Sequence, residues 1–289
     1  MNPILFHINY FEQGQTTERA CELARQLGAD GVEFRRKPGA FKGTDLEYLD
    51  EVSRALERHP LEWISFGGPG VNLMTGDPET TERELAAAEA FFRKAAGRFP
   101  LKVVNSFTGT LANADKSLPF VEYWHHGSTV ATPAQWEAAT AGFQRMGALA
   151  GELGFRFAFE THGVYLHDTV EATMKLVSAI NSPNVGLLWD HANLMLFPTS
   201  PSLEEVITRS GDKLFYVHLK NLLFSPSRFL AVSSLSGGII NVREQVKRLL
   251  ASGYTGPIAI EAPRQGDREQ FAKEDLAYIR EVLESANAS

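Results

Sequence analysis

Short apolar runs alternate with longer amphipathic segments from one end of the chain to the other. Eight such runs occur, at residues 4–9, 31–34, 61–66, 101–107, 155–160, 185–190, 213–218 and 256–261. Runs of this length, bounded by glycine, proline or polar residues, are typical of strands buried in a parallel sheet. The segments between them carry apolar residues at helical spacing, as in residues 17–27, which Gly28 follows as a helix stop.

Most of the predicted helices begin with a capping signal, a short polar residue followed three positions later by glutamate or glutamine. Thr132 is the fullest example, because Pro133 supplies the proline of the first turn and Gln135 the capping partner. The same signature predicts helix starts at Thr44, Thr81, Asp168, Ser202, Asn241 and Asp267.

Eight strand-then-helix units predict an α/β fold, a single (β/α)8 barrel domain over residues 1–289. An open doubly wound sheet is the alternative, but it usually carries a glycine-rich turn after its first strand, and HINYFEQGQ is not one. Residues 108–131 and 219–240 are longer than ordinary loops. Both follow strands, so we expect them at the carboxyl end of the barrel as lids or as subunit contacts in a homo-oligomer.

The last four predicted strands each end in a residue that could bind a metal. FAFE ends at Glu160, VGLLWD at Asp190, LFYVH at His218 and PIAIE at Glu261. A lone acid at a strand end often caps a helix or bonds a loop instead. Because the carboxyl ends of parallel strands meet at one edge of a barrel, four such tips together indicate one metal site.

An oxygen-rich set of two glutamates, an aspartate and a histidine suits Mn²⁺, Mg²⁺ or Co²⁺ better than zinc. An octahedral ion with four protein ligands keeps positions open for a substrate with neighbouring hydroxyl and carbonyl oxygens. Such an ion would stabilise an enediolate. We expect Glu160 and Glu261 to lie on either side of the reacting carbon as catalytic acid and base.

The composition limits the expected binding partners and cellular compartment of the protein. The 289 residues are 44% hydrophobic and 22% charged, as in an ordinary globular protein, and the net charge of −7 argues against nucleic acid or an anionic membrane as partner. The single cysteine, Cys21, allows no internal disulfide, so a reducing compartment is expected. The N-terminus lacks the basic region of a signal peptide, and no apolar run approaches a membrane span, which favours the cytoplasm.

Four motifs resemble the xylose-isomerase-like barrel superfamily, most of all its sugar phosphate isomerase/epimerase group. They are ETHG at 160–163, VGLLWDHANL at 185–194, HLKN at 218–221 and GYTGPIAIE at 253–261. The group includes ketose 3-epimerases, hydroxypyruvate isomerases and inosose dehydratases. The resemblance implies a divalent metal, first of all Mn²⁺, held by the four strand-tip residues, and it implies that Glu160 and Glu261 move the substrate proton.

The chain departs from the family pattern near the expected substrate. Family members often carry a histidine three positions after the aspartate of the sixth strand, where this chain has Asn193, and they often read HLKD where it has Asn221. These differences leave the metal ligands unchanged and leave the substrate open.

We predict that His162, Asn193, Lys220 and Arg228 bind the substrate. His162 and Lys220 each follow a metal ligand by two positions, which returns them to the same side of an extended chain. Arg228 lies in a long loop where related epimerases often place a substrate-binding arginine. Other arginines, such as Arg35 and Arg264, follow strand ends and could favour an anionic sugar, although surface ion pairing is the simpler role.

The main hypothesis is therefore a metal-dependent isomerase or epimerase of a ketose or keto-sugar acid. The alternative is a metal-dependent lyase, a dehydratase or decarboxylase of an oxidised sugar acid, because an enediolate serves either outcome. An endonuclease IV-like repair enzyme is disfavoured, since FGGPG and NSFTG place no histidine at the third and fourth strand tips. A barrel that merely binds a sugar would lack both metal and turnover.

Overall fold

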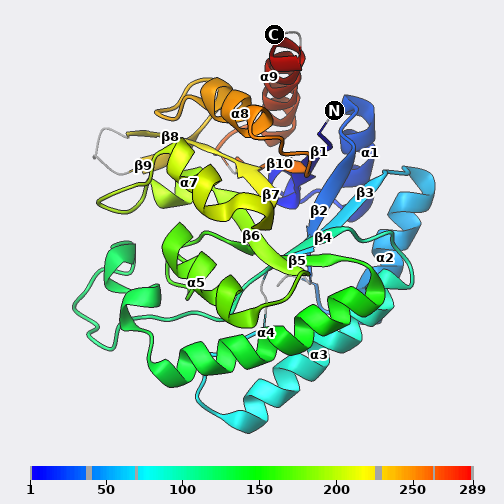
Figure 1. Ribbon diagram of the computed structural model, residues 1–289. Helices are drawn as coiled ribbons and strands as arrows, with labels where there is room; N and C mark the ends of the chain where they lie inside the picture. Colours follow the sequence, from blue (N-terminus) through cyan, green and yellow to red (C-terminus); the bar gives the residue numbers. More distant parts are fainter. Residues whose placement is uncertain (1, 37–40, 69–70, 225–229, 263, 288–289) are drawn as a thin grey trace.

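The central feature of the protein is a closed sheet of eight parallel strands ringed by helices (Figure 1). The computed structural model describes residues 2–36, 41–68, 71–224, 230–262 and 264–287. The strands follow the order β3-β2-β1-β10-β7-β6-β5-β4, and β3 lies beside β4 at the closure. The predicted (β/α)8 barrel is confirmed.

The strands are short and agree with the predicted runs. They are β1 (Ile4–His7), β2 (Gly31–Arg35), β3 (Trp63–Gly67), β4 (Val103–Ser106), β5 (Arg156–Glu160), β6 (Val185–Asp190), β7 (Leu214–Leu219) and β10 (Ile258–Ile260). The helices are α1 (Thr17–Leu27), α2 (Asp45–Arg58), α3 (Pro78–Ala96), α4 (Pro133–Leu153), α5 (Val170–Ile180), α6 (His191–Leu194), α7 (Leu203–Ser210), α8 (Val242–Ala251) and α9 (Arg268–Asn287).

Most helix starts agree with the capping prediction. Complete capping boxes form at Thr44, Thr132 and Ser202. Asn241 caps α8 and Asp267 accepts from the backbone of Gln270, as expected. Gly28 ends α1 in the left-handed conformation, with φ of 80°, which glycine adopts without strain.

Two predicted helix starts are wrong. Asp77, rather than Thr81, caps α3, because Pro78 already supplies the first helical position and Asp77 accepts from the backbone of Thr80. Thr169, rather than Asp168, caps α5, and the carboxylate of Asp168 bonds a neighbouring loop instead.

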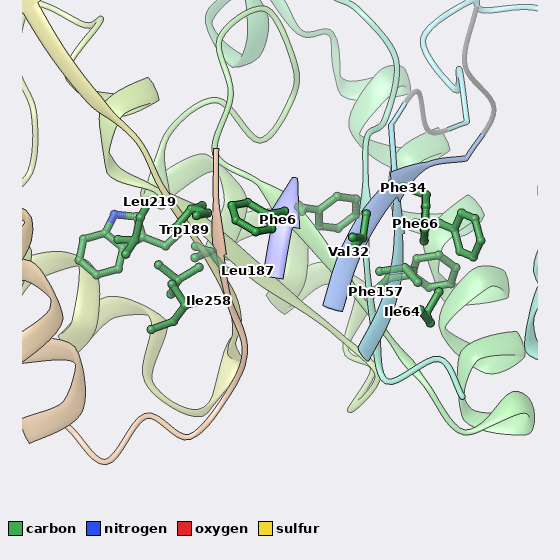
Figure 2. Close-up of a cluster of buried hydrophobic side chains, with 14 of the residues drawn as sticks. Phe6, Val32, Phe34, Ile64, Phe66, Phe157, Leu187, Trp189, Leu219 and Ile258 are labelled. Atoms are coloured by element: carbon green, nitrogen blue, oxygen red, sulfur yellow. The ribbon is translucent and has the colours of Figure 1, made fainter. Parts of the chain in front are cut away.

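Apolar side chains on the two faces of the strands form two cores. Outward residues pack against the helices, as Figure 2 shows for Val32 and Phe34 of β2 and Ile64 and Phe66 of β3. Inward residues form a smaller cluster inside the barrel: Leu5, Val103, Ala158, Leu188, Phe215, Tyr216 and Ala259. The interior below the strand tips is therefore a packed floor rather than a channel.

The two long segments after β4 and β7 contain structure of their own. Residues 108–131 include the short helices η2 (Tyr123–His125) and η3 (Gly127–Val130), and Thr110 bridges to Tyr165. Residues 219–240, expected as a long loop, contain an antiparallel hairpin of β8 (Asn221–Phe224) and β9 (Leu230–Ser233). Two more short helices, η1 (Ile8–Phe11) and η4 (Gly211–Lys213), complete the described elements. No helix in the described part of the chain could cross a bilayer.

Candidate metal centre

The four strand-tip residues face the inside of the barrel because side chains alternate along a strand. Each lies two positions after a residue of the inner core, in the pairs Ala158 and Glu160, Leu188 and Asp190, Tyr216 and His218, and Ala259 and Glu261. The strand register then sets Asp190 beside His218. The four polar side chains thus form one layer directly above the apolar floor.

Glu160, Asp190, His218 and Glu261 form one compact cluster. One ligand atom from each side chain lies within 4.8 Å of all the others. Asp190 and His218 are fully buried, and Glu261 is partly open toward the mouth of the barrel. The structure therefore brings together all four residues predicted to bind a metal.

His218 presents its two ring nitrogens to different partners. Nδ1 lies 3.2 Å from Glu261 Oε2 and 3.9 Å from Glu160 Oε2, whereas Nε2 lies 2.8 Å from Glu33 Oε2. Burial alone would lower the pKa of His218, but the charges of Glu33, Glu261 and Glu160 outweigh burial and hold it well above its ordinary value.

Lys220 places its ammonium among the same carboxylates. Nζ lies 2.8 Å from Asp190 Oδ2 and 3.2 Å from Glu261 Oε2. Burial would lower the pKa of Lys220, but the charges of Asp190 and Glu261 raise it by more than burial lowers it. The amine therefore stays charged. Lys220 therefore extends from the strand tip into the cluster, as its two-residue offset from His218 predicts.

Three asparagine amides hold the two glutamates. Asn105 donates to Glu160 Oε2 at 2.7 Å, and Asn193 donates to Glu160 Oε1 at 2.9 Å. Asn9 donates to Glu261 Oε1 at 3.0 Å. Sequence reasoning missed Asn9 and Asn105: Asn9 ends the predicted run 4–9, as the four predicted ligands end theirs, whereas Asn105 lies within the run 101–107.

The two glutamates differ in their electrostatic surroundings. Burial raises the pKa of Glu160 more than the charge of His218 lowers it. Burial would also raise the pKa of Glu261, but the charges of Lys220, His7 and His218 are stronger and hold it well below its usual range.

The cluster has the chemistry of a divalent metal site. Three carboxylates and one imidazole nitrogen are an oxygen-rich donor set of the kind that Mg²⁺ and Mn²⁺ accept. Three carboxylates this close, two of them buried, repel one another unless cations neutralise them. The ammonium of Lys220 and the proton of His218 balance part of this charge, and a divalent cation would bind the lone pairs of all four ligands directly.

A pocket of about 530 Å³ opens above the cluster. Asn193 and Lys220 line it, and both side chains also contact the carboxylates of the cluster. Residues 121–124 form one wall, and the β8–β9 hairpin forms another with Leu222, Phe224 and Val232. The size suits a small organic molecule.

Two predicted substrate residues remain, His162 and Arg228. His162 lies outside the cluster, with Nδ1 2.9 Å from the carbonyl oxygen of Gly163 and its ring near Phe107 and Tyr165. Arg228 lies outside the described residues.

The arginines considered for an anionic substrate have ion-pair partners. Arg35 makes two hydrogen bonds to Glu12, at 2.6 and 2.9 Å, and Arg264 lies 2.8 Å from Asp275. Both contacts agree with the simpler expectation of ion pairing.

His167 and Asp168 tie the segment 108–131 to the end of β5. Burial lowers the pKa of His167 to about 3, so its ring is neutral; Nδ1 donates to the carbonyl oxygen of Glu160 and Nε2 accepts from the backbone of Thr108. Asp168 Oδ2 accepts from the backbone of Ser128 at 2.9 Å. One wall of the pocket is thereby fixed relative to Glu160.

Comparison with known proteins agrees with this geometry. An inosose dehydratase from Clostridium botulinum is 25% identical over 295 residues, covering 93% of this chain and 94% of the relative. A xylose isomerase-like TIM barrel protein from Mycobacterium smegmatis, solved in complex with magnesium, superposes with a TM-score of 0.75 at 22% identity, covering 99% and 98% of the two chains.

A structure of L-ribulose 3-epimerase superposes with the same TM-score of 0.75 at 18% identity, covering 100% of this chain and 96% of that one. At this identity the likeness concerns the fold. Residues 21–282 match the sequence profile described as xylose isomerase-like TIM barrel. The chain therefore belongs to the xylose isomerase-like TIM barrel family.

Proposed function

We propose that this protein is a divalent-metal-dependent dehydratase of a polyhydroxylated ketone, a keto-sugar or keto-cyclitol. The single observation that carries the proposal is the pair of glutamates, the buried Glu160 and the partly open Glu261, in one four-residue ligand cluster. The two residues come from β5 and β10, which β6 and β7 separate in the sheet. A substrate carbon between them could lose a proton to one carboxylate and receive a proton from the other.

The asparagines support such a role because they restrict both carboxylates. Asn105 and Asn193 hold the two oxygens of Glu160, and Asn9 holds one oxygen of Glu261. A carboxylate held in one orientation needs little reorganisation before it accepts or delivers a proton. Lys220, charged and lining the pocket, could donate a hydrogen bond to a substrate oxygen.

A bound divalent cation, held by Glu160, Asp190, His218 and Glu261, would polarise the substrate carbonyl and so acidify the neighbouring C–H bond. In a dehydration, one glutamate removes that proton, and the C–H electron pair forms the new carbon–carbon double bond. The hydroxyl group on the next carbon leaves with a proton from the second carboxylic acid. The products are one unsaturated ketone or its tautomer and one water.

The inosose dehydratase relative, similar over 93% of this chain, favours dehydration over the isomerase first expected. Epimerisation is the second candidate, and the same glutamate pair favours it. Removal of the substrate proton by Glu160, followed by delivery of a different proton from Glu261 to the opposite face, would invert a carbon without any change in composition.

The test is a panel of inososes, ketoses and keto-glycosides incubated in deuterated water with Mn²⁺-loaded protein. A dehydratase produces a compound lighter than the substrate by one water. An epimerase produces an isomer that carries one solvent deuterium at the inverted carbon. Recovery of every compound unchanged and unlabelled from fully metal-loaded protein would contradict both candidates.

The variants Glu160→Gln and Glu261→Gln identify the proton-transfer groups. Each amide is close in size to the carboxylate but cannot accept a proton, so turnover should fall by about 100-fold or more. Glu12→Gln is the matched control, because Glu12 pairs with Arg35 and lies outside the cluster. Full activity of either cluster variant would refute the acid–base assignment.

A further inference from the structure

Glu33 is a buried acid that belongs to the site without being one of the four clustered residues. It lies on β2, and its side chain is fully buried. Oε2 is 2.8 Å from Nε2 of His218, and Oε1 accepts from Asn105 at 3.3 Å. Gly67 on β3 makes room for this carboxylate, since a Cβ at that position would overlap Glu33 Oε1.

The contact with Glu33 decides which nitrogen of His218 faces the cluster. Nδ1 lies on the side of Glu261 and Glu160, so that nitrogen must offer its lone pair to a cation. A neutral imidazole has one proton, which must then be on Nε2, where Glu33 accepts it. Glu33 thus favours the tautomer that a metal requires.

Packing around the ring supports the same orientation. The Tyr216 ring meets the His218 ring edge-on at 5.1 Å, and the His7 ring meets it edge-on at 5.6 Å. These neighbours set the plane of the imidazole, and Glu33 sets its hydrogen-bonding direction.

Glu33 also reaches a second cluster residue. The same amide nitrogen of Asn105 lies 3.3 Å from Glu33 Oε1 and 2.7 Å from Glu160 Oε2. Loss of the Glu33 carboxylate would therefore remove a hydrogen bond from His218 directly and loosen Asn105, which holds Glu160.

We propose that Glu33 is a positioning residue of the metal centre: it holds His218 with Nε2–H toward β2 and Nδ1 toward the cation, and it steadies Glu160 through Asn105. The proposal depends on the metal site of the proposed function, and it adds a fifth residue that acts through the ligands. Partners of this kind usually contribute about 10- to 100-fold to metal affinity.

The first experiment titrates Mn²⁺ into metal-stripped wild type and Glu33→Gln and follows free Mn²⁺ by electron paramagnetic resonance. We expect Glu33→Gln to bind about 10- to 100-fold more weakly. At saturating Mn²⁺, the kcat of Glu33→Gln should be reduced by a smaller factor than its Mn²⁺ affinity is. Asp275→Asn is the matched control, because Asp275 is equally buried but pairs with Tyr10 and Arg264, so its Mn²⁺ affinity should remain that of wild type.

A double-mutant cycle separates positioning from a general loss of structure. Once His218→Gln has removed the imidazole, adding Glu33→Gln should weaken Mn²⁺ binding much less than it does in wild type. Equal effects in both backgrounds would overturn the proposal.

A spectroscopic measurement on the wild type needs no variant. Long-range ¹H–¹⁵N correlation on histidine-labelled, Zn²⁺-loaded protein should show Nε2 of His218 protonated and Nδ1 bound to metal. Metal on Nε2, or wild-type affinity in Glu33→Gln, overturns the role of Glu33. Absence of Mn²⁺ binding in wild type overturns the metal site itself, so the two failures are distinguishable.

Discussion

The most telling single residue is Lys220, because it lies between two carboxylates that a metal would also bind. Its ammonium is 2.8 Å from Asp190 and 3.2 Å from Glu261, and only 10% of its side chain is exposed. Removing one partner of a buried charge pair leaves uncompensated charge, which is strongly destabilising. Lys220 thus contributes positive charge to the cluster as well as a donor group to the pocket.

Lys220→Met should lower the stability of the metal-stripped protein by about 3 to 5 kcal/mol, because Asp190 and Glu261 lose their shared cation. Saturating Mn²⁺ should restore much of that loss, since the ion supplies positive charge at the same carboxylates. Urea unfolding with and without Mn²⁺ measures both effects.

Lys213→Met is the control. Lys213 directly precedes the N-terminal end of β7, away from the cluster, and donates to the carbonyl oxygen of Ser182. Mn²⁺ should stabilise it as much as it stabilises wild type. A Lys220→Met protein as stable as wild type without metal would contradict the account of Lys220.

Sequence reasoning could find the four clustered residues because each ends a short apolar run that is typical of a buried parallel strand. Ala158 and Glu160 illustrate this, since both face inward in consecutive layers. The roles of Glu33, Asn9 and Asn105 could not be read in the same way. Their partners come from strands distant in sequence, so the hydrogen bonds depend on the barrel register and on side-chain rotamers.

At the level of elements, local signals predicted most boundaries and failed where two signals compete. Asp77 with Pro78 outcompetes Thr81 as the start of α3. The hairpin of β8 and β9 was missed because residues 219–240 show no separate strand–helix pattern. The hairpin is stabilised by tertiary contacts, such as the hydrogen bond from the backbone of Ile240 to Asn221, which the sequence does not reveal.

The buried carboxyl group of Asp168, which contacts Ser128, predicts that the free energy of unfolding depends on pH. Burial raises the pKa of Asp168 to about 6, so the fold favours the protonated acid. The stabilising contribution of this group is therefore fully present below about pH 4 and is lost as the pH rises through 6.

Asp168→Asn keeps an oxygen that can accept from Ser128 but cannot ionise. Relative to wild type, the variant should gain stability between pH 4 and pH 7, by about 2 to 3 kcal/mol. Chemical denaturation at a series of pH values measures this difference. Asp115 is exposed and lies in the segment 108–131 that Asp168 contacts, so Asp115→Asn should show no such gain. A pH-independent stability difference for Asp168→Asn would contradict the titration of Asp168.

At the level of the whole molecule, the barrel gathers polar residues from strands far apart in sequence above an apolar floor. Glu33 of β2, Asn105 of β4 and Glu160 of β5 are joined by one amide nitrogen, which links two sides of the sheet closure. A ligand that binds only this folded arrangement must stabilise the fold, by an amount that grows with the logarithm of the ratio of ligand concentration to Kd. Metal binding and folding are therefore coupled.

The most direct test of the account is calorimetric titration of Mn²⁺ into metal-stripped protein, with Asp190→Asn as the ligand variant. Asp212→Asn, at the opposite end of the barrel in η4, is the matched control. We expect one ion per chain for wild type and Asp212→Asn. Asp190→Asn loses a charged ligand, so its affinity should be lower by about 100-fold or more. No binding by wild type, or equal binding by Asp190→Asn, would contradict the metal centre on which the proposed function depends.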